Sequence, residues 1–235
     1  MDNKQINDRF KYLNTAVIVD ACLRAKVEYR IANTGIKPIN PNTLLAGNVR
    51  PVKHFGSVDI FLEAILNSKK GDVLVIDNQG RLDEACVGDL TALELRAHGL
   101  SGFIIWGLHR DEKELLAIDF PTLSYGSFPS GPVRLDSTEE DSLSDIEFCN
   151  FRVTNYDVVF ADINGVVFFE KIHVKKILGV AENIWRAERI QMQQIEKGVP
   201  LTEQLKFNEY LEMRSKSEEY TFRQHLRKIG GEIEE

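Results

Sequence analysis

A glycine at the start of a helical pattern belongs to the first of two segments that could bind a ligand. This segment consists of Gly88, Asp89, Leu90 and Thr91. A glycine lets the backbone come close to a ligand, and the free amides of the three residues after it form a site for an anion such as a carboxylate. The side chain of Asp89 has two interpretations: it points into the same site, or it offsets the helix dipole.

The second segment is the pair Arg110-Asp111, on a loop that begins at Gly107. An adjacent Arg-Asp pair is more often an exposed surface pair than a site. However, a metal-binding carboxylate beside a planar guanidinium is what a 2-oxo acid would require. The sequence therefore leaves both interpretations of this pair open.

The elements around these segments predict that the two loops meet. Residues 73–76 and 103–106 are short apolar runs typical of buried strands, and residues 90–97 between them have a helical pattern. Such a βαβ unit has parallel strands and a right-handed crossover, so both loops open at the carboxyl edge of the sheet. Ligands of α/β proteins usually bind at that edge.

The rest of the chain predicts one α/β domain with a helical C-terminal extension. Helices are expected over residues 6–25, 58–66 and 112–117, strands near residues 121–125, 153, 158–160 and 166–169, and a hairpin turn at 162–165. Residues 34–51 contain three prolines and two glycines and have no assigned element, and the acidic stretch 127–144 is expected to be an exposed loop. From residue 170 the chain is expected to be helical, with a break at 198–200. We predict domain limits of 1–180 for the α/β domain and 181–235 for the extension, which would pack on that domain or on a neighbouring subunit.

Composition narrows the classes of partner. The chain of 235 residues has 43% hydrophobic and 28% charged residues, typical of a globular protein, and a net charge of -7 that disfavours nucleic acid as a partner. The three cysteines, Cys22, Cys86 and Cys149, are far apart and fit a reducing cytoplasm. The sequence has neither a signal-peptide pattern nor an apolar run long enough to cross a bilayer. We therefore expect a cytoplasmic protein without a membrane or nucleic-acid partner.

Other polar residues have simpler explanations. The five histidines lack the spacing of a metal site, and His109 is expected only to line the cleft. Asp77 is expected to form a turn, as is Asp72. The acidic run 136–145 fits a solvated loop, and the charged residues 218–235 fit an exposed helix face.

The run from Gly71 to Asp111 resembles the family shared by 4-hydroxy-4-methyl-2-oxoglutarate aldolases and the regulator of ribonuclease activity A. Its sequence contains GDVLVID, then CVGDLTALELRAHGLSGFIIWG, then Arg110-Asp111. The segments TAVIVDA (15–21), DVVFADINGVVF (157–168) and TFRQHLRKIGG (221–231) are also similar to the family. The most specific part is Gly-Asp at the helix start combined with Gly-x-x-Arg-Asp after the next strand.

The resemblance implies a swivelling β/β/α fold that assembles as a homotrimer or homohexamer, with active sites between subunits. Enzymatic members are similar to this chain in having Asp directly after the loop Arg, where it holds a divalent metal, and the ribonuclease regulator lacks that carboxylate. Asp111 is present here. A single carboxylate is sufficient for Mg²⁺, which keeps water and substrate oxygens as its other ligands; Mn²⁺ could replace it.

The family chemistry implies roles for these residues. Asp111 would hold the metal, and the substrate carboxylate would meet the amides of residues 88–91. Arg110 would stabilise an enolate formed by retro-aldol cleavage of a 4-hydroxy-2-oxo acid or by decarboxylation of oxaloacetate, and both reactions release pyruvate. Asp89 would position a water for protonation at C3.

A C-terminal acid is a further candidate. On the helix expected over residues 174–197, Glu188 falls on an apolar stripe between Ile184 and Met192. Family members are similar in placing such an acid near the neighbouring subunit's site, and Glu182 is the alternative residue. A partly exposed Glu at the edge of the stripe explains the pattern equally well.

The alternative function for the whole chain is that of a non-catalytic regulator that binds another protein, such as a ribonuclease.

Overall fold

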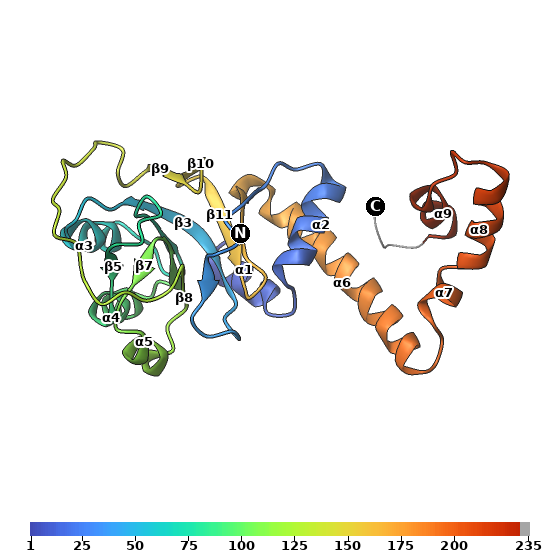
Figure 1. Ribbon diagram of the computed structural model, residues 1–235, viewed down its shortest axis with the longest axis horizontal. Coiled ribbons are helices and arrows are strands. Elements are labelled where there is room, and N and C mark those ends of the chain that lie inside the picture. Colours follow the sequence, from blue (N-terminus) through green and yellow to red (C-terminus); the bar gives the residue numbers. More distant parts are fainter. Residues whose placement is uncertain (231–235) are drawn as a thin grey trace.

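The computed structural model describes residues 1–230 as a curled α/β sheet with flanking helices and a helical arm (Figure 1). The strand order of the main sheet is β1-β12-β11-β3-β4-β6-β8-β2. These strands are β1 (Arg30–Ile31), β2 (Lys37–Pro38), β3 (Leu45–Lys53), β4 (Val73–Asp77), β6 (Gly102–Trp106), β8 (Thr122–Ser124), β11 (Asp157–Ala161) and β12 (Val166–Glu170). The predicted α/β fold with a helical C-terminal extension is confirmed.

Side chains point to opposite faces of the sheet in alternation along each strand, and this divides the apolar core into layers. In β4, Val73 and Val75 pack inside the curl of the sheet, and Leu74 and Ile76 face the opposite side. That outer side is covered by α3 (Asp59–Leu66), α4 (Asp89–Ala97) and α5 (Glu112–Ile118). Over β11 and β12 it is covered by α1 (Asn3–Phe10), α2 (Thr15–Ala25) and α6 (Val174–Glu196). Because strands buried on both faces need apolar residues at every position, the continuous runs in the sequence are explained.

The N-terminal helical region expected over residues 6–25 is two helices, because the chain breaks after Phe10. A capping box of Asp2 and Gln5 begins α1. The side chain of Asn14 accepts a hydrogen bond from the Val17 amide at 2.9 Å and so begins α2.

The central strand β3 is the main element that the sequence pattern missed, since it lies in the stretch with prolines and glycines. Residues 45–48 pair antiparallel with β11, and residues 49–53 pair parallel with β4. Pro51 therefore lies outside the segment that pairs with β11. Because no hydrogen bond to β11 is made at this position, the missing N–H of proline costs none on that side. A second miss is Asp72, which is buried and bonds Arg50 and Asn3 in addition to closing a turn.

Several of the remaining elements agree with the predicted ones. β4 and β6 are parallel, and β11 and β12 form an antiparallel hairpin across residues 162–165. Two small sheets join β9 (Asp145–Phe148) to β10 (Phe151–Thr154), and β5 (Ala85–Val87) to β7 (Leu108–His109). The last pair replaces part of the loop expected after Gly107.

The C-terminal region consists of η1 (Lys171–His173), the long helix α6, then α7 (Leu201–Gln204), α8 (Phe207–Lys216) and α9 (Phe222–Ile229). The first half of α6 packs on α2, and its second half extends away from the sheet (Figure 1). The expected domain limit at residue 180 falls inside this continuous helix, and the two-part division stays a prediction. The predicted exposed charged face continues into residues 231–235, which lie outside the described residues. Within residues 1–230, every helix is too short or too polar to cross a bilayer.

Candidate active site

The two loops predicted to meet do lie together at the carboxyl edge of β4 and β6. The chain leaves β4, forms β5 and enters α4 at Gly88; it leaves β6, forms β7 and reaches Arg110. Strands β5 and β7 pair in parallel, and the Arg110 amide donates to the Val87 carbonyl at 2.9 Å. The βαβ topology therefore places Gly88 directly beside Arg110 and Asp111.

Gly88 is required by space rather than by backbone angle. Its φ of -143° is open to any residue, but a Cβ at this position would lie 2.2 Å from Oδ2 of Asp111. Such a contact is far inside van der Waals distance, so a side chain would displace the carboxylate. Because Gly88 has no side chain, the space that a Cβ would occupy is available to the Asp111 carboxylate.

Asp111 is held in a conformation that keeps its carboxylate available. It has φ 60° and ψ 41°, and it is the N-cap of α5 without making a side-chain cap hydrogen bond. The left-handed conformation is unfavourable for most residues and commonly marks functional positions. The nearest cation is the Nε of Arg110, 3.4 Å from Oδ2, and the two side chains are 51% and 35% exposed. They line a pocket of about 330 Å³ together with Glu112, Ser127, Phe128 and Pro129.

The start of α4 faces this arrangement with one amide already occupied. Oδ1 of Asp89 accepts a hydrogen bond from the Leu90 amide at 2.7 Å. Thr91 is buried, whereas the Leu90 side chain is 76% exposed. The expected anion site at the amides of residues 88–91 stays a prediction, and the Leu90 amide would have to leave Asp89 to take part in it.

His109, which directly precedes the pair, is buried and is not among the residues that line the pocket, so the expectation that it lines the cleft is wrong. Its Nδ1 lies 2.7 Å from Oγ of Ser124, and its Nε2 is a buried atom without a hydrogen-bond partner. Burial lowers the pKa of His109, so the ring is neutral at pH 7. A neutral ring adds no positive charge to the pocket, which leaves Arg110 as the cation among the described residues that line it.

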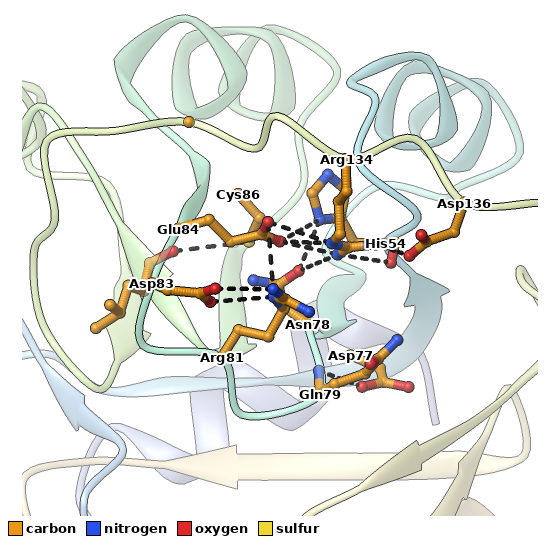
Figure 2. A network of polar contacts seen from close by, with 12 residues as sticks. His54, Asp77, Asn78, Gln79, Arg81, Asp83, Glu84, Cys86, Arg134 and Asp136 are labelled. Atoms are coloured by element: carbon orange, nitrogen blue, oxygen red, sulfur yellow. Dashed lines mark hydrogen bonds and ion pairs between the residues drawn. The ribbon is translucent and has the colours of Figure 1, made fainter.

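Figure 2 shows a buried ion-pair network that the sequence did not reveal, and its residue Glu84 directly precedes β5, the strand that leads to Gly88. Arg134, from the loop expected to be exposed, donates from Nη2 to Oε1 of Glu84 at 2.8 Å and to Oδ1 of Asn78 at 3.0 Å. The Nδ1 of His54 lies 2.7 Å from the same Oδ1 atom. The side chain of Glu84 is 5% exposed and that of Arg134 is 15% exposed.

This network fixes the outer loop against the predicted site. Glu84 immediately precedes β5, and the Ser130 carbonyl accepts a hydrogen bond from the Ala85 amide at 2.8 Å. The Phe128 amide donates to the His109 carbonyl, also at 2.8 Å. The first part of the loop, residues 127–130, is therefore an added edge on β5 and β7. Its side chains are exposed or half-buried, which confirms the expected exposure, but its backbone is bonded to these strands. No local pattern in the sequence connects Arg134 to Glu84, fifty positions earlier.

The two acidic candidates on α6 differ in their surroundings. Glu182 accepts a hydrogen bond from Nε of Arg9 at 2.5 Å and so joins α6 to α1. Glu188 is half-buried, and burial raises its pKa, with nearby Asp20 acting in the same direction. In Figure 1, α6 lies beside α2, far from α4 and α5, so one chain does not bring Glu188 to Asp111.

A divalent metal fits the residues at this edge. Within residues 1–230, no group of three or more His, Cys, Asp or Glu side chains is arranged to hold a metal. Mg²⁺ commonly takes one or two protein carboxylates and keeps several waters. The Asp111 carboxylate makes no helix-capping hydrogen bond, and Gly88 leaves the space that it occupies. A carboxylate in these surroundings meets that requirement.

The curled α/β sheet and its glycine-and-carboxylate edge define an RraA-like fold. The family model described as "RraA-like: Aldolase/RraA" matches residues 15–168, and the chain belongs to this family. A protein of Alkalilimnicola ehrlichii named "Putative 4-hydroxy-4-methyl-2-oxoglutarate aldolase" is 28% identical over 148 residues, which cover 63% of this chain and 91% of that protein.

Solved structures support the same fold. An uncharacterized protein from Pseudomonas syringae pv. tomato has a TM-score of 0.71 at 22% identity, covering 84% of this chain and 95% of that chain. The RNA-processing inhibitor RraA of Thermus thermophilis has a TM-score of 0.54 at 22% identity, covering 60% of this chain and 85% of that chain. The family thus includes proteins named as aldolases and proteins named as regulators.

Proposed function

We propose that this chain is a divalent-metal-dependent lyase that releases pyruvate. Its substrate would be a 4-hydroxy-2-oxo acid of the 4-hydroxy-4-methyl-2-oxoglutarate type, oxaloacetate, or both. The observation that carries the proposal is the position of the Asp111 carboxylate. It makes no helix-capping hydrogen bond and lies against Gly88 and beside the Arg110 guanidinium. A protein that only binds a partner would not need an acid that makes no capping hydrogen bond and pairs only with Arg110, at 3.4 Å, at the ligand-binding edge of the sheet.

The residues of the chain would divide the chemistry among them. Asp111 would hold Mg²⁺ or Mn²⁺, which as a Lewis acid polarises the 2-oxo group. Arg110 would donate hydrogen bonds to the substrate as negative charge develops on C2 oxygen, and its planar fork suits two oxygens at once. Asp89, at the start of α4, would orient the water that returns a proton to C3.

The proposed assembly is a homotrimer or homohexamer in which a neighbour completes each site with Glu188. Two observations support this role. Glu188 is half-buried, which raises its pKa, and its helix α6 lies far from α5, the helix that begins after Asp111 (Figure 1). Glu182 is a weaker candidate because Arg9 already neutralises it.

The test is pyruvate release, followed with a coupled dehydrogenase, from oxaloacetate and a panel of 4-hydroxy-2-oxo acids with Mg²⁺ or EDTA. Asp111→Asn should lower turnover at least about a hundredfold and weaken Mn²⁺ binding measured by calorimetry. Asp59→Asn is the matched control, because Asp59 is also an exposed acid at a helix start, and it should change neither quantity. Full activity in EDTA or in Asp111→Asn would contradict the metal-dependent mechanism, and no pyruvate from any substrate would favour the regulator.

A further inference from the structure

His109 connects the loop of the candidate site to β8 and to the segment that follows it. The His109 amide donates to the Gly126 carbonyl at 3.0 Å, and the His109 carbonyl accepts from the Phe128 amide at 2.8 Å. The Nδ1 of its ring lies 2.7 Å from Oγ of Ser124, the last residue of β8. The main-chain contacts do not require a histidine, so the contact between the ring and the hydroxyl is the one that depends on residue type.

The hydroxyl of Ser124 is the only hydrogen-bond partner of the His109 ring within residues 1–230. The ring Nε2 is buried without a partner, and the residue is 1% exposed. Oγ of Ser124 also accepts from the Gly126 amide at 2.9 Å, so the hydroxyl is itself held in place. Without this hydroxyl, both ring nitrogens would be buried and unpaired, which is a costly state. The ring would regain a hydrogen bond by moving toward water, and the main chain at residue 109 would move with it.

A shift of His109 would reach Asp111, two residues further along the chain. Asp111 has φ 60° and ψ 41°, a left-handed conformation that aspartate tolerates better than most residues but that still depends on the main chain around it. After this residue, the main chain is fixed where the Asp111 carbonyl accepts from the Leu115 amide at 2.9 Å. Before it, the main chain is fixed where the Arg110 amide donates to the Val87 carbonyl and where His109 meets the segment after β8. The His109 side chain therefore belongs to the contacts that determine where the Asp111 carboxylate lies.

We propose that His109 is a positioning residue for the Asp111 carboxylate and that the Ser124 hydroxyl holds His109 in this role. The inference rests on the proposed function, in which this carboxylate holds a divalent metal. His109 does not line the pocket, so it acts through the main chain rather than by contact with a ligand. The hydroxyl fixes the ring, the ring fixes residue 109, and residue 109 fixes the chain that enters Asp111.

A double-mutant cycle on Mn²⁺ binding tests this role without any substrate. Ser124→Ala removes the hydroxyl, His109→Leu removes the ring nitrogens, and the double variant removes both. We expect each single variant to weaken Mn²⁺ binding, measured by calorimetry, about tenfold, which corresponds to about 1.4 kcal/mol and is the size of one net hydrogen bond. The double variant should weaken binding by about the same factor as either single variant, because the two side chains act as one unit.

Two matched controls separate positioning from a general loss of stability. Thr122→Val removes another buried hydroxyl from β8, one that donates to a main-chain carbonyl at 2.9 Å. His225→Leu removes another buried imidazole, whose Nε2 lies 2.8 Å from a main-chain carbonyl, on α9, which is far from α5 (Figure 1). Both controls should lower the free energy of unfolding in urea and leave Mn²⁺ affinity unchanged. All variants are titrated under conditions in which urea unfolding shows native protein.

Comparison with pyruvate release separates this inference from the proposed function. Excess Mn²⁺ should restore most of kcat in Ser124→Ala but not in Asp111→Asn, because only the second variant lacks the ligand. Coupled losses of Mn²⁺ affinity in a protein that releases no pyruvate would support the positioning role and overturn the lyase activity. Unchanged Mn²⁺ affinity in Ser124→Ala and His109→Leu, with pyruvate release by the unmodified protein, would overturn the positioning role alone. An unmodified protein that binds no Mn²⁺ would overturn both.

Discussion

Removal of Arg134 from its ion pair with Glu84 should be one of the most destabilising single substitutions in this domain, because it leaves a buried carboxylate without its main partner. Arg134→Met removes the guanidinium and leaves the 5% exposed carboxylate of Glu84 with Arg81, whose Nε is 3.6 Å from Oε2. Removing one partner of a buried pair costs about 3–5 kcal/mol. Because Arg81 remains nearby, we expect a loss of about 3 kcal/mol, which a domain with a typical stability of about 5–15 kcal/mol survives.

The assay is urea unfolding at neutral pH, with amide exchange of Ala85 as a local probe. The double variant Glu84→Gln/Arg134→Met should lose less free energy than Arg134→Met alone, since no unpaired charge stays buried. The Ala85 amide, bonded to the Ser130 carbonyl, should exchange faster in Arg134→Met if the pair holds the loop. Arg152→Met is the matched control, because it breaks an exposed pair with Asp145 and should have no measurable effect. A loss below about 0.5 kcal/mol in Arg134→Met, or unchanged Ala85 exchange, would refute this reasoning.

Three further predictions test the site and the fold. Gly88→Ala should lower pyruvate release roughly a hundredfold and weaken Mn²⁺ binding, because the added Cβ displaces the Asp111 carboxylate. Gly179→Ala is the control and should change neither quantity, since the nearest atom to its Cβ would be 4.0 Å away. Asp77→Asn should stabilise the protein by about 1–2 kcal/mol above neutral pH. Burial raises the pKa of Asp77 from 3.8 to about 6, so ionisation of this carboxyl lowers the stability of the native protein as the pH rises through that window. Urea unfolding should show that the gain in the variant shrinks as the pH falls from about 6 to 4, and a constant gain would contradict the assignment. Glu188→Gln should lower kcat with the oligomer intact, and mixed reassembly with Asp111→Ala subunits should recover activity; no recovery despite confirmed mixing would remove Glu188 from the site.

The meeting of Gly88 and Asp111 could be predicted because it follows from chain topology. Two apolar runs flanking one helix make parallel strands, and parallel strands leave their following loops at one edge. The structure has that arrangement, with β4 and β6 in parallel and the Gly88 position in contact with Asp111. The roles of these residues stay predictions, since adjacency alone does not define a reaction.

The strand β3 and the side chain of Arg134 could not be predicted because both depend on distant partners. Gly47 and Pro51 weaken the local strand preference of β3, and pairing with β4 and β11 overrides it. Arg134 lies in a stretch that contains prolines and a glycine and leads into an acidic run, a composition typical of exposed loops. Its burial depends on Glu84, whose position relative to the loop is fixed only after β5 and β7 have paired.

Glu188 shows what one chain can and cannot define. Its place on an apolar helical stripe predicted a carboxylate in unusual surroundings, and the raised pKa agrees with that. The residues that face it from its own chain include Asp20, which repels it, and Arg189, which attracts it. In the proposed assembly a second copy would meet Glu188 on the second half of α6, which extends away from the sheet (Figure 1).

The two sides of the pocket beside Arg110 and Asp111 are held by different means. At Gly88 the space is already filled, since a Cβ there would lie 2.2 Å from Oδ2 of Asp111, so substitution disturbs that carboxylate. Residues 128–130 are held through backbone hydrogen bonds, from the Phe128 amide to the His109 carbonyl and from the Ala85 amide to the Ser130 carbonyl. Because these bonds do not involve the Phe128 side chain, an exchange of Phe128 is expected to leave Arg110 and Asp111 in place.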